Sequence, residues 1–409
     1  MSSKTTGNKR TVITLTLTAS LIYAINCGIR SNYGILLNPI VQNSGVSYSS
    51  VSFIIAMAQL TYGIMQPVFG AAALKKTNQF VLKCGVIMSA AGIISIPFCK
   101  SFVLLLASLG ILLPSGFAAL AFGIVMGTIT PGLPKNRTAT VSGIVTASAG
   151  LGSTVFSPLI QFLTVAAGLA GCMLFIGIPT LILLPVSILM CRNGDTEAAA
   201  ADDDLPVPEK NDIRKMVRNA FADHDYVCIF FGFFTCGFHM AIIETHLFTQ
   251  ITTYGFSAGF TSIAFSAYGV AAMIGAVLSG ILCDHIKMGH VLAALYGSRT
   301  IMVAAFLVLP KNALTIYAFL ILLGLTGNAT VPPTSGLTSN LFGAAKLGTL
   351  FGLAFLAHQI GSFFSAWFGG ICVTATGTYT LIWLVDIVLC TAASIVCTRI
   401  RNTGNISKY

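Results

Sequence analysis

The sequence predicts an all-α integral membrane protein whose twelve transmembrane helices form two pseudo-symmetric halves of six helices each. Charged residues make up 8% of the 409-residue chain and hydrophobic residues 55%, whereas soluble domains carry about 25% charged residues. Apolar stretches of roughly 20 residues, each about long enough to cross a bilayer core, recur twelve times along the chain. The basic residues between them are sorted into alternating gaps, which is typical of a polytopic membrane protein.

Each apolar stretch is interpreted as one membrane span. The spans lie near residues 11–33, 51–73, 81–99, 102–130, 141–163, 166–190, 227–250, 260–282, 291–309, 313–331, 348–373 and 379–398. Of the 22 Lys and Arg residues, 18 fall at the two ends, in every second gap or, in the case of Lys83, just inside the span that follows such a gap, and only Lys100 and Lys311 fall in the other gaps. The positive-inside rule therefore predicts a multi-pass protein of the cell inner membrane with both termini in the cytoplasm.

Residues 1–192 are expected to form the N-terminal half. Its first span is too long for the apolar part of a cleaved signal peptide, and no small-residue cleavage site follows it, so we expect this span to be retained. Small residues such as Gly143 and Gly150 run along the fifth span, where they favour close helix packing. The eleven cysteines of the chain include no CxxC pair, so neither disulfides nor a metal site is predicted.

Residues 193–224 are expected to link the two halves on the cytoplasmic side. Residues 193–212 are acidic, rich in Ala and contain Pro, which predicts a flexible segment. Residues Ile213–Ala222 are predicted to form a short basic amphipathic helix on the inner membrane surface. The net charge of +10 is explained by such basic segments facing anionic lipid headgroups. Membrane lipid is therefore an expected partner, and nucleic acid is not.

Residues 225–409 are expected to form the C-terminal half, which repeats a feature of the first. The gap after the eighth span carries the pattern G-x-x-x-D-x-x-x-x-G from Gly280 to Gly289, and the gap after the second span begins at Gly70 and is also short and basic. Two six-span halves with matching signatures are typical of a transporter built from repeats.

These features and several short motifs resemble the major facilitator superfamily, in particular a bacterial branch near the monocarboxylate transporters and the oxalate/formate exchangers. The matching stretches are Gly28–Gly34, Glu244–Leu247, Tyr296–Arg299, Val331–Gly336, Phe351–Gly361 and Gly377–Tyr379. The resemblance covers nearly the whole chain. It implies the major facilitator fold, with a central cavity between the two halves that opens to one side of the membrane at a time.

Arg30, in the last turns of the first span, is the principal candidate for binding substrate. An ionisable group at membrane depth is costly and is functional by default, and a guanidinium is always charged and grips a carboxylate with two parallel hydrogen bonds. No acidic residue lies near Arg30 in the sequence, so we expect an anionic substrate to supply the missing charge. The alternative is that Arg30 extends to the headgroups at the outer membrane surface.

Three further ionisable residues inside the spans are candidates for the same site. His358 lies in the eleventh span, where the resemblance places a cavity helix, and histidine can carry a proton near neutral pH. Arg299 lies in the ninth span and is expected either to contact substrate or to pair with a backbone carbonyl or with Asp386. His239 lies deeper in the seventh span than His246 and is the better cavity candidate.

Other polar residues are expected to line the cavity or to form its gates. The neutral lining residues are Asn26, Tyr33, Gln59, Gln66, Tyr268, Asn328 and Thr330. Glu244 and His246 lie near the outer end of the seventh span, where they are expected to form a gate or a helix-cap network. Asp284 and Lys287 are expected to form a cytoplasmic latch between the eighth and eleventh spans, with the Asp paired to a helix end or a basic residue.

One departure from the resemblance affects the substrate. The monocarboxylate transporters and oxalate/formate exchangers carry an arginine eight residues before the acidic residue that corresponds to Asp284, and this chain has Ala276 there. Binding of a carboxylate is therefore expected to depend on Arg30, with Arg299 and His358 assisting.

The sequence as a whole predicts a secondary active transporter that moves a small organic anion, a mono- or dicarboxylate, across the cytoplasmic membrane by alternating access, with a proton or a counter-anion as the second partner. The alternative on the same fold is an exporter of drug-like or amphipathic compounds, which the missing arginine keeps open. The chain lacks the pattern G-x-x-x-x-G-K-[ST], so ATP is not the expected energy source and no cofactor is predicted. No nucleophile–base pair or metal cluster stands out, so an enzyme is not expected, and the short linker leaves no room for a signalling domain.

Overall fold

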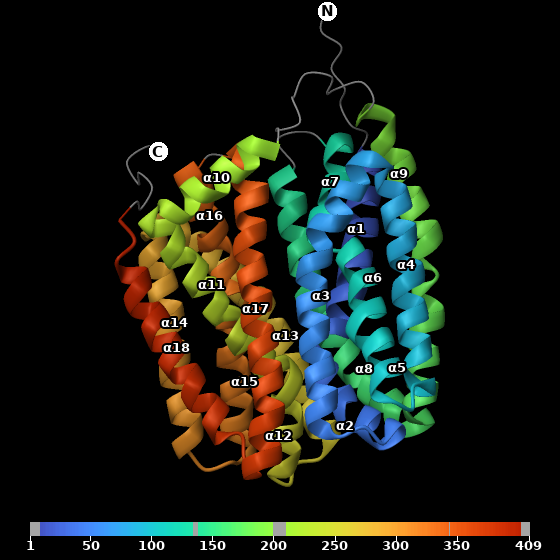
Figure 1. The fold of residues 1–409 in the computed structure, drawn as a ribbon, viewed down its shortest axis with the longest axis vertical. Coiled ribbons are helices and arrows are strands. Elements are labelled where there is room, and N and C mark those ends of the chain that lie inside the picture. Colours follow the sequence, from blue (N-terminus) through green and yellow to red (C-terminus); the bar gives the residue numbers. More distant parts are fainter. Residues whose placement is uncertain (1–8, 134–137, 199–209, 343, 402–409) are drawn as a thin grey trace, which may run out of the picture.

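The computed structural model describes residues 9–133, 138–198, 210–342 and 344–401. All regular structure within these ranges is helical. Helices α1–α9 form one bundle and α11–α18 a second bundle beside it, with α10 lying across one end of the second (Figure 1). We call the end of the molecule where α1 begins, α18 ends and α10 lies the terminal face, and the other end the opposite face (Figure 1).

The first bundle follows the predicted order of spans. Its helices are α1 (Lys9–Arg30), α2 (Tyr33–Ser44), α3 (Tyr48–Lys75), α4 (Asn78–Ser95), α5 (Phe102–Leu105), α6 (Leu113–Ala119), α7 (Phe122–Ile129), α8 (Thr138–Thr180) and α9 (Leu183–Ala198). The segment η2 (Leu106–Leu112), between α5 and α6, is a π-helix.

The second bundle is preceded by α10 (Lys210–Ala222). Its helices are α11 (His224–Ile242), α12 (Phe248–Thr253), α13 (Ala258–His285), α14 (Met288–Val308), α15 (Ala313–Gly327), α16 (Val331–Phe342), α17 (Ala344–Thr376) and α18 (Thr380–Thr398). The π-helical segment η4 (Ile243–Leu247) joins α11 to α12, and the 3-10 turn η5 (Asn328–Thr330) joins α15 to α16.

Twelve crossings fit the observed helices. Eleven helical segments are long and apolar enough to cross a membrane, and the longest of these, Gly143–Cys191, spans 49 residues. This segment is broken at Gly168, whose φ of +66° and ψ of −176° belong to a backbone region that is essentially restricted to glycine. The break divides the segment into the fifth and sixth predicted spans, so the predicted twelve-helix membrane fold is confirmed.

Short polar side chains fix where several of these helices begin. The hydroxyls of Ser47, Thr77 and Ser257 accept hydrogen bonds from backbone N–H groups in the first turns of α3, α4 and α13. The side chain of Asn312 does the same for α15. Each of these N-caps satisfies one of the backbone donors that the first turn of a helix leaves free.

Three spans contain breaks in the helix that hydropathy did not predict. The first span is broken between α1 and α2, the fourth between α6 and α7, and the tenth at η5. The predicted first span, near residues 11–33, matches the apolar segment Arg10–Arg30, and beyond the break α2 continues to Ser44 despite Pro39 inside it. Irregular backbone within a membrane must find other hydrogen-bond partners, and the side chains that provide them are described below.

Of the predicted flexible segment 193–212, residues 199–209 lie outside the described residues, whereas residues 193–198 end α9 and residues 210–212 begin α10. The predicted amphipathic helix is present as α10 and begins at Lys210, three residues before the predicted start. Its Met216 and Ala220 pack against Tyr226 of α11 and Leu350 of α17. This packing fixes α10 to the terminal face of the second bundle.

The two bundles are in contact toward the opposite face and separate toward the terminal face. A Cβ added at Gly63 of α3 would lie 2.7 Å from Gln359 of α17, and one added at Gly150 of α8 would lie 2.8 Å from the backbone of α13. Gly70 and Gly143 lie seven residues closer to the terminal face on the same sides of these helices. A Cβ at either position would meet no described atom of another helix within 4 Å.

Candidate functional site

Arg30 ends α1 and extends into the contact between the two bundles. Its Nη1 donates a hydrogen bond to Gln59 Oε1 of α3 at 3.1 Å and lies 3.7 Å from Glu244 Oε2 in η4. The guanidinium carbon lies 5.0 Å from the centre of the Tyr62 ring, also on α3. Arg30 is thus held by a hydrogen bond, an ion pair and a cation–π contact. These contacts place it between the bundles, so the alternative of an arginine extended to the headgroups is wrong.

Glu244 reaches this position because the seventh span is π-helical there. A π-helical segment adds a residue to the turn and changes the direction of the side chains that follow, and such segments are frequent at functional sites. Gly34 of α2 packs on this segment so closely that a Cβ there would lie 2.9 Å from the Glu244 carbonyl oxygen. Gln59 Nε2 donates to Glu244 Oε2 at 3.3 Å, so the amide of Gln59 bridges Arg30 and Glu244.

The expectation that Arg30 lacks a protein counter-ion is wrong. Glu244 supplies a negative charge from the other bundle, and nothing in the local sequence around Arg30 reveals a partner so distant in the chain. One edge of the guanidinium nevertheless stays open: Nε is buried without a hydrogen-bond partner, and Nη2 makes no hydrogen bond with a described residue. Nε and Nη2 together form the fork that holds a carboxylate with two parallel hydrogen bonds.

Further unpartnered polar atoms lie in and around this group. The Tyr33 hydroxyl, His358 Nδ1 and both amide atoms of Gln359 are buried and have no hydrogen-bond partner among the described residues. Tyr33 and His358 lie within electrostatic range of both Arg30 and Glu244. Buried polar groups are nearly always hydrogen-bonded. Several such groups beside one open guanidinium edge therefore indicate a binding site for a polar molecule.

His358 occupies the aromatic side of the site. Its ring is stacked on Phe355 with centroids 5.5 Å apart and packs against Phe233 at 5.2 Å. The residue as a whole is half-buried. The site therefore presents apolar ring faces next to a cation, a combination that suits an anion with a small apolar portion.

Asn26 and Arg299, both predicted to contact substrate, serve the interrupted spans instead. Asn26 Nδ2 donates to the carbonyl oxygens of Phe117 and Leu120 at the break between α6 and α7, each at 2.9 Å. Arg299 is fully buried, and its Nη2 donates to the carbonyls of Thr326 and Gly327 at the end of α15. The expected carbonyl pairing of Arg299 is confirmed, and the alternative pairing with Asp386 is wrong.

His239 is also separate from the group around Arg30, contrary to its prediction as a cavity residue. It is fully buried inside the second bundle, where its Nδ1 lies 2.8 Å from Asp386 Oδ2. Cys390 donates from its Sγ to Asp386 Oδ1 at 3.7 Å. Within the described part of the chain, these three side chains are the group whose ligand atoms lie close enough together to hold a metal ion. Their mutual hydrogen bonds account for their proximity, because a buried carboxylate must be hydrogen-bonded.

His246 belongs to a hydrogen-bond network that connects the bundles toward the opposite face. Its Nε2 donates to the Ala366 carbonyl of α17 at 2.8 Å, so its Nδ1 accepts from the Tyr48 hydroxyl of α3 at 3.1 Å. The Tyr48 hydroxyl also lies 2.9 Å from the Tyr379 hydroxyl. The gating role of His246 stays a prediction, whereas Glu244 belongs to the Arg30 group.

The remaining predicted residues lie in different parts of the molecule. The Tyr268 hydroxyl donates to the Met240 sulfur at 3.7 Å, on the side of the site formed by α13. Asn328 is partly buried in the 3-10 turn η5. Lys287 is exposed at the start of α14, and the side chain of Asp284 lies outside the described ones, so the latch remains a prediction. Tyr62 was missed, although it follows Gln59 by three residues on the same face of the second span.

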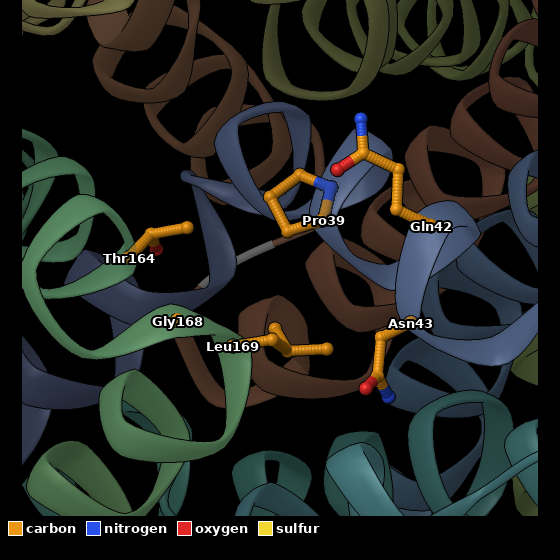
Figure 2. A pocket seen from close by; sticks show the side chains of 6 residues that line it. All are labelled: Pro39, Gln42, Asn43, Thr164, Gly168 and Leu169. Carbon is orange, nitrogen blue, oxygen red and sulfur yellow. The ribbon is translucent and has the colours of Figure 1, made fainter.

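A separate hollow lies near the opposite face, between α2 and the break in α8 (Figure 2). Its volume is about 310 Å³, and its lining residues are Pro39, Gln42, Asn43, Thr164, Gly168 and Leu169. None of these side chains carries a charge. This hollow therefore offers no group comparable to Arg30.

Comparison with known proteins agrees with this architecture. The family profile of the Major Facilitator Superfamily matches residues 19–366. An uncharacterized MFS-type transporter, YcxA, of Bacillus subtilis is 23% identical, with 90% of each chain covered. Monocarboxylate transporter 13 of Bos taurus is also 23% identical, over 90% of this chain and 84% of that protein. The oxalate:formate antiporter of Oxalobacter formigenes is 23% identical, over 88% of this chain and 85% of that protein.

The fold is also similar to that of a solved transporter. A bacterial homologue of the human lysosomal transporter Spinster, in an inward-facing and unoccupied conformation, superposes with a TM-score of 0.73 and 15% sequence identity. The match covers 96% of this chain and 99% of that one. At this level of identity the likeness concerns the fold.

Proposed function

The chain belongs to the Major Facilitator Superfamily, and from this premise we propose that it is a secondary active transporter of a small organic anion, a mono- or dicarboxylate. The observation that carries this proposal is the open Nε–Nη2 edge of Arg30, which lies between the two bundles. A carboxylate is the complementary group for this edge in geometry and in charge. The names of two relatives, a monocarboxylate transporter and an oxalate:formate antiporter, support the same substrate class.

The transport mechanism in this proposal is alternating access. Residues 1–192 and 225–409 move as two halves joined by the linker 193–224. The contacts at Gly63 and Gly150 and the network of His246 hold the halves together toward the opposite face, while Gly70 and Gly143 face open space. The terminal face is the cytoplasmic one by the distribution of basic residues, so this conformation faces inward, in the inner membrane.

The substrate site in this proposal is smaller than the predicted set of residues. Arg30 binds the carboxylate, His358 and Tyr33 provide hydrogen-bonding groups, and Phe355 and Tyr62 contact the apolar part of the anion. Arg299, Asn26 and His239 act indirectly by supporting the helices. Ala276 contributes no charge where the relatives of the resemblance have arginine, which leaves Arg30 as the cation with an open edge among the described site residues.

The proposal is tested by transport in proteoliposomes with the purified protein. Radiolabelled formate, lactate, oxalate and succinate are compared with lactamide and oxamide, their uncharged analogues, in the presence of a proton gradient and then of internal unlabelled anion. We expect uptake of at least one carboxylate and of neither amide. Uptake of amphipathic dyes without any carboxylate would instead support the exporter alternative and overturn the anion proposal.

A further inference from the structure

The next inference rests on the proposed function and concerns the energy source for anion transport. It is drawn from the contacts around Arg30. We propose that Glu244 is the proton-binding residue that couples carboxylate transport to proton movement. Deprotonated Glu244 shares Nη1 of Arg30 with Gln59. A proton on Glu244 neutralises this acid and gives the substrate carboxylate the whole charge of the guanidinium.

The charge balance of the site supports this coupling. Arg30 and Glu244 together are neutral, and their side chains are only 17% and 9% exposed. A carboxylate that enters beside an ionised Glu244 makes the site an anion in a medium of low dielectric, where an unpaired charge is expensive. A carboxylate that enters together with one proton leaves the site neutral. The bound state with both is therefore strongly favoured over the state with the anion alone.

The hydrogen bonds of Gln59 are suited to sense the proton. Gln59 accepts from Arg30 Nη1 at 3.1 Å and donates to Glu244 Oε2 at 3.3 Å. The direct distance between Nη1 and Oε2 is longer, at 3.7 Å. Glu244 therefore accepts a hydrogen bond from Gln59 and lies at a long ion-pair distance from Arg30. A proton on Glu244 weakens this ion pair, while Arg30 keeps its contacts with Gln59 and Tyr62.

Glu244 also occupies a position that can transmit its protonation state to the conformation. Arg30 and Gln59 belong to the first bundle, and Glu244 belongs to η4 of the second. The ion pair therefore joins the halves on the side where they are in contact. Its neutralisation weakens one of the links between α1, α3 and η4, so binding of proton and anion alters the balance between the two conformations.

Among the described residues, few other titratable groups lie within electrostatic range of Glu244. From the first bundle they are Cys27, Arg30, Tyr33 and Tyr62, and from the second Tyr268 and His358. Phenol and thiol groups keep their protons at neutral pH, and arginine stays charged. His358 is thus the competing proton carrier within this set, and the experiment must separate it from Glu244.

The test uses the full-length protein in proteoliposomes and the best carboxylate of the panel above. Wild type, Glu244→Gln, Glu244→Asp and His358→Gln are each assayed for accumulation driven by a proton gradient and for exchange at equal pH. We expect Glu244→Gln to lose gradient-driven accumulation and still exchange anion, and Glu244→Asp to keep a response to the gradient. His358→Gln, which removes a substrate-binding group, should transport more slowly but keep the wild-type ratio of gradient-driven accumulation to exchange. Accumulation by Glu244→Gln at the wild-type level would overturn the inference, as would loss of the gradient response in His358→Gln alone.

A second measurement does not depend on the variants. If one proton binds with each anion, the affinity of the wild type for the carboxylate rises as pH falls, by up to about tenfold per pH unit, the limit for one coupled proton. A dye inside the vesicles should report acidification when the anion enters. An affinity independent of pH, or anion entry without acidification, contradicts the role of Glu244. Absence of carboxylate transport by the wild type would contradict the proposed function itself, so the two failures are distinguishable.

Discussion

Arg30 of the first bundle and Glu244 of the second lie 3.7 Å apart, and the amide of Gln59 bridges them. This pair joins the two halves where they are in contact and leaves one edge of the guanidinium open. Substrate binding and its coupling to conformational change both depend on this pair.

Replacing Gln59 by Leu should weaken anion binding. A hydrogen bond to a charged group contributes about 1.5–3 kcal/mol, and about 1.4 kcal/mol corresponds to a factor of ten in affinity. We therefore expect the apparent KM for the carboxylate to rise roughly 10- to 100-fold, because Arg30 and Glu244 lose their bridge. Gln42→Leu is the matched control, since Gln42 is an exposed glutamine beside the hollow at the opposite face (Figure 2). An equal effect of both changes would show that Gln59 has no special role.

Removing the ring of Tyr62 should also weaken binding, by a smaller amount. The ring lies under the guanidinium of Arg30 with 5.0 Å from the guanidinium carbon to its centre, and such cation–π contacts contribute about 0.5–2 kcal/mol. Tyr62→Phe keeps a ring face and should transport almost normally, whereas Tyr62→Ala should raise the KM by roughly 2- to 30-fold. If Tyr62→Phe is as impaired as Tyr62→Ala, the hydroxyl is the important group and the cation–π interpretation fails.

A bulky side chain at Gly70 should stop the transport cycle without unfolding the protein. An added Cβ there meets no described atom of another helix within 4 Å in this conformation, so Gly70→Leu should fold with a normal Tm. Closure of the terminal face brings α3 toward α17, and the new side chain should obstruct it. Uptake should therefore be lost, while the carboxylate still binds to the detergent-solubilised protein.

The control for Gly70 is Gly123→Leu on α7. Gly123 is exposed, and a Cβ there also meets no described atom of another helix within 4 Å, but it lies on a helix that does not line the contact between the bundles. It should transport normally. Normal uptake by Gly70→Leu would mean that this part of α3 stays apart from α17 throughout the cycle.

Asn26→Ala should lower stability and leave the affinity for substrate unchanged. The side chain donates two hydrogen bonds to carbonyls at the break between α6 and α7, and leaving buried carbonyls without partners costs about 1–3 kcal/mol each. A lower Tm with an unchanged KM in the folded fraction is the expected pair of results. A raised KM with a normal Tm would return Asn26 to the substrate site.

Much of the fold could be predicted from the sequence because length and hydropathy directly reflect the thickness of the bilayer. The twelve spans were found in this way, and so was the amphipathic helix α10. The interruptions could not be found in this way, because hydropathy reports the polarity of side chains and not the backbone conformation of segments such as η4 and η5. The break at Gly168, whose positive φ and extended ψ suit only glycine, lies a few residues after the predicted gap between the fifth and sixth spans.

The candidate site was predicted only in part, for a related reason. Ionisable residues within apolar spans stand out, so Arg30, Glu244 and His358 were identified. Their partners depend on which helices are neighbours, and neither the pairing of Arg30 with Glu244 nor that of His239 with Asp386 follows from spacing along the chain. Arg299 illustrates the same limit, because the carbonyls that it binds become free only where the tenth span breaks.

The most direct test of the account is the binding of the transported carboxylate and its uncharged amide to wild type and to Arg30→Lys, measured by calorimetry on the purified protein. Lysine keeps the charge but lacks the planar fork. The account predicts that wild type binds the carboxylate and not the amide, and that Arg30→Lys binds the carboxylate at least about tenfold more weakly. Equal affinity of the two proteins for the carboxylate, or equal binding of acid and amide by wild type, would contradict it.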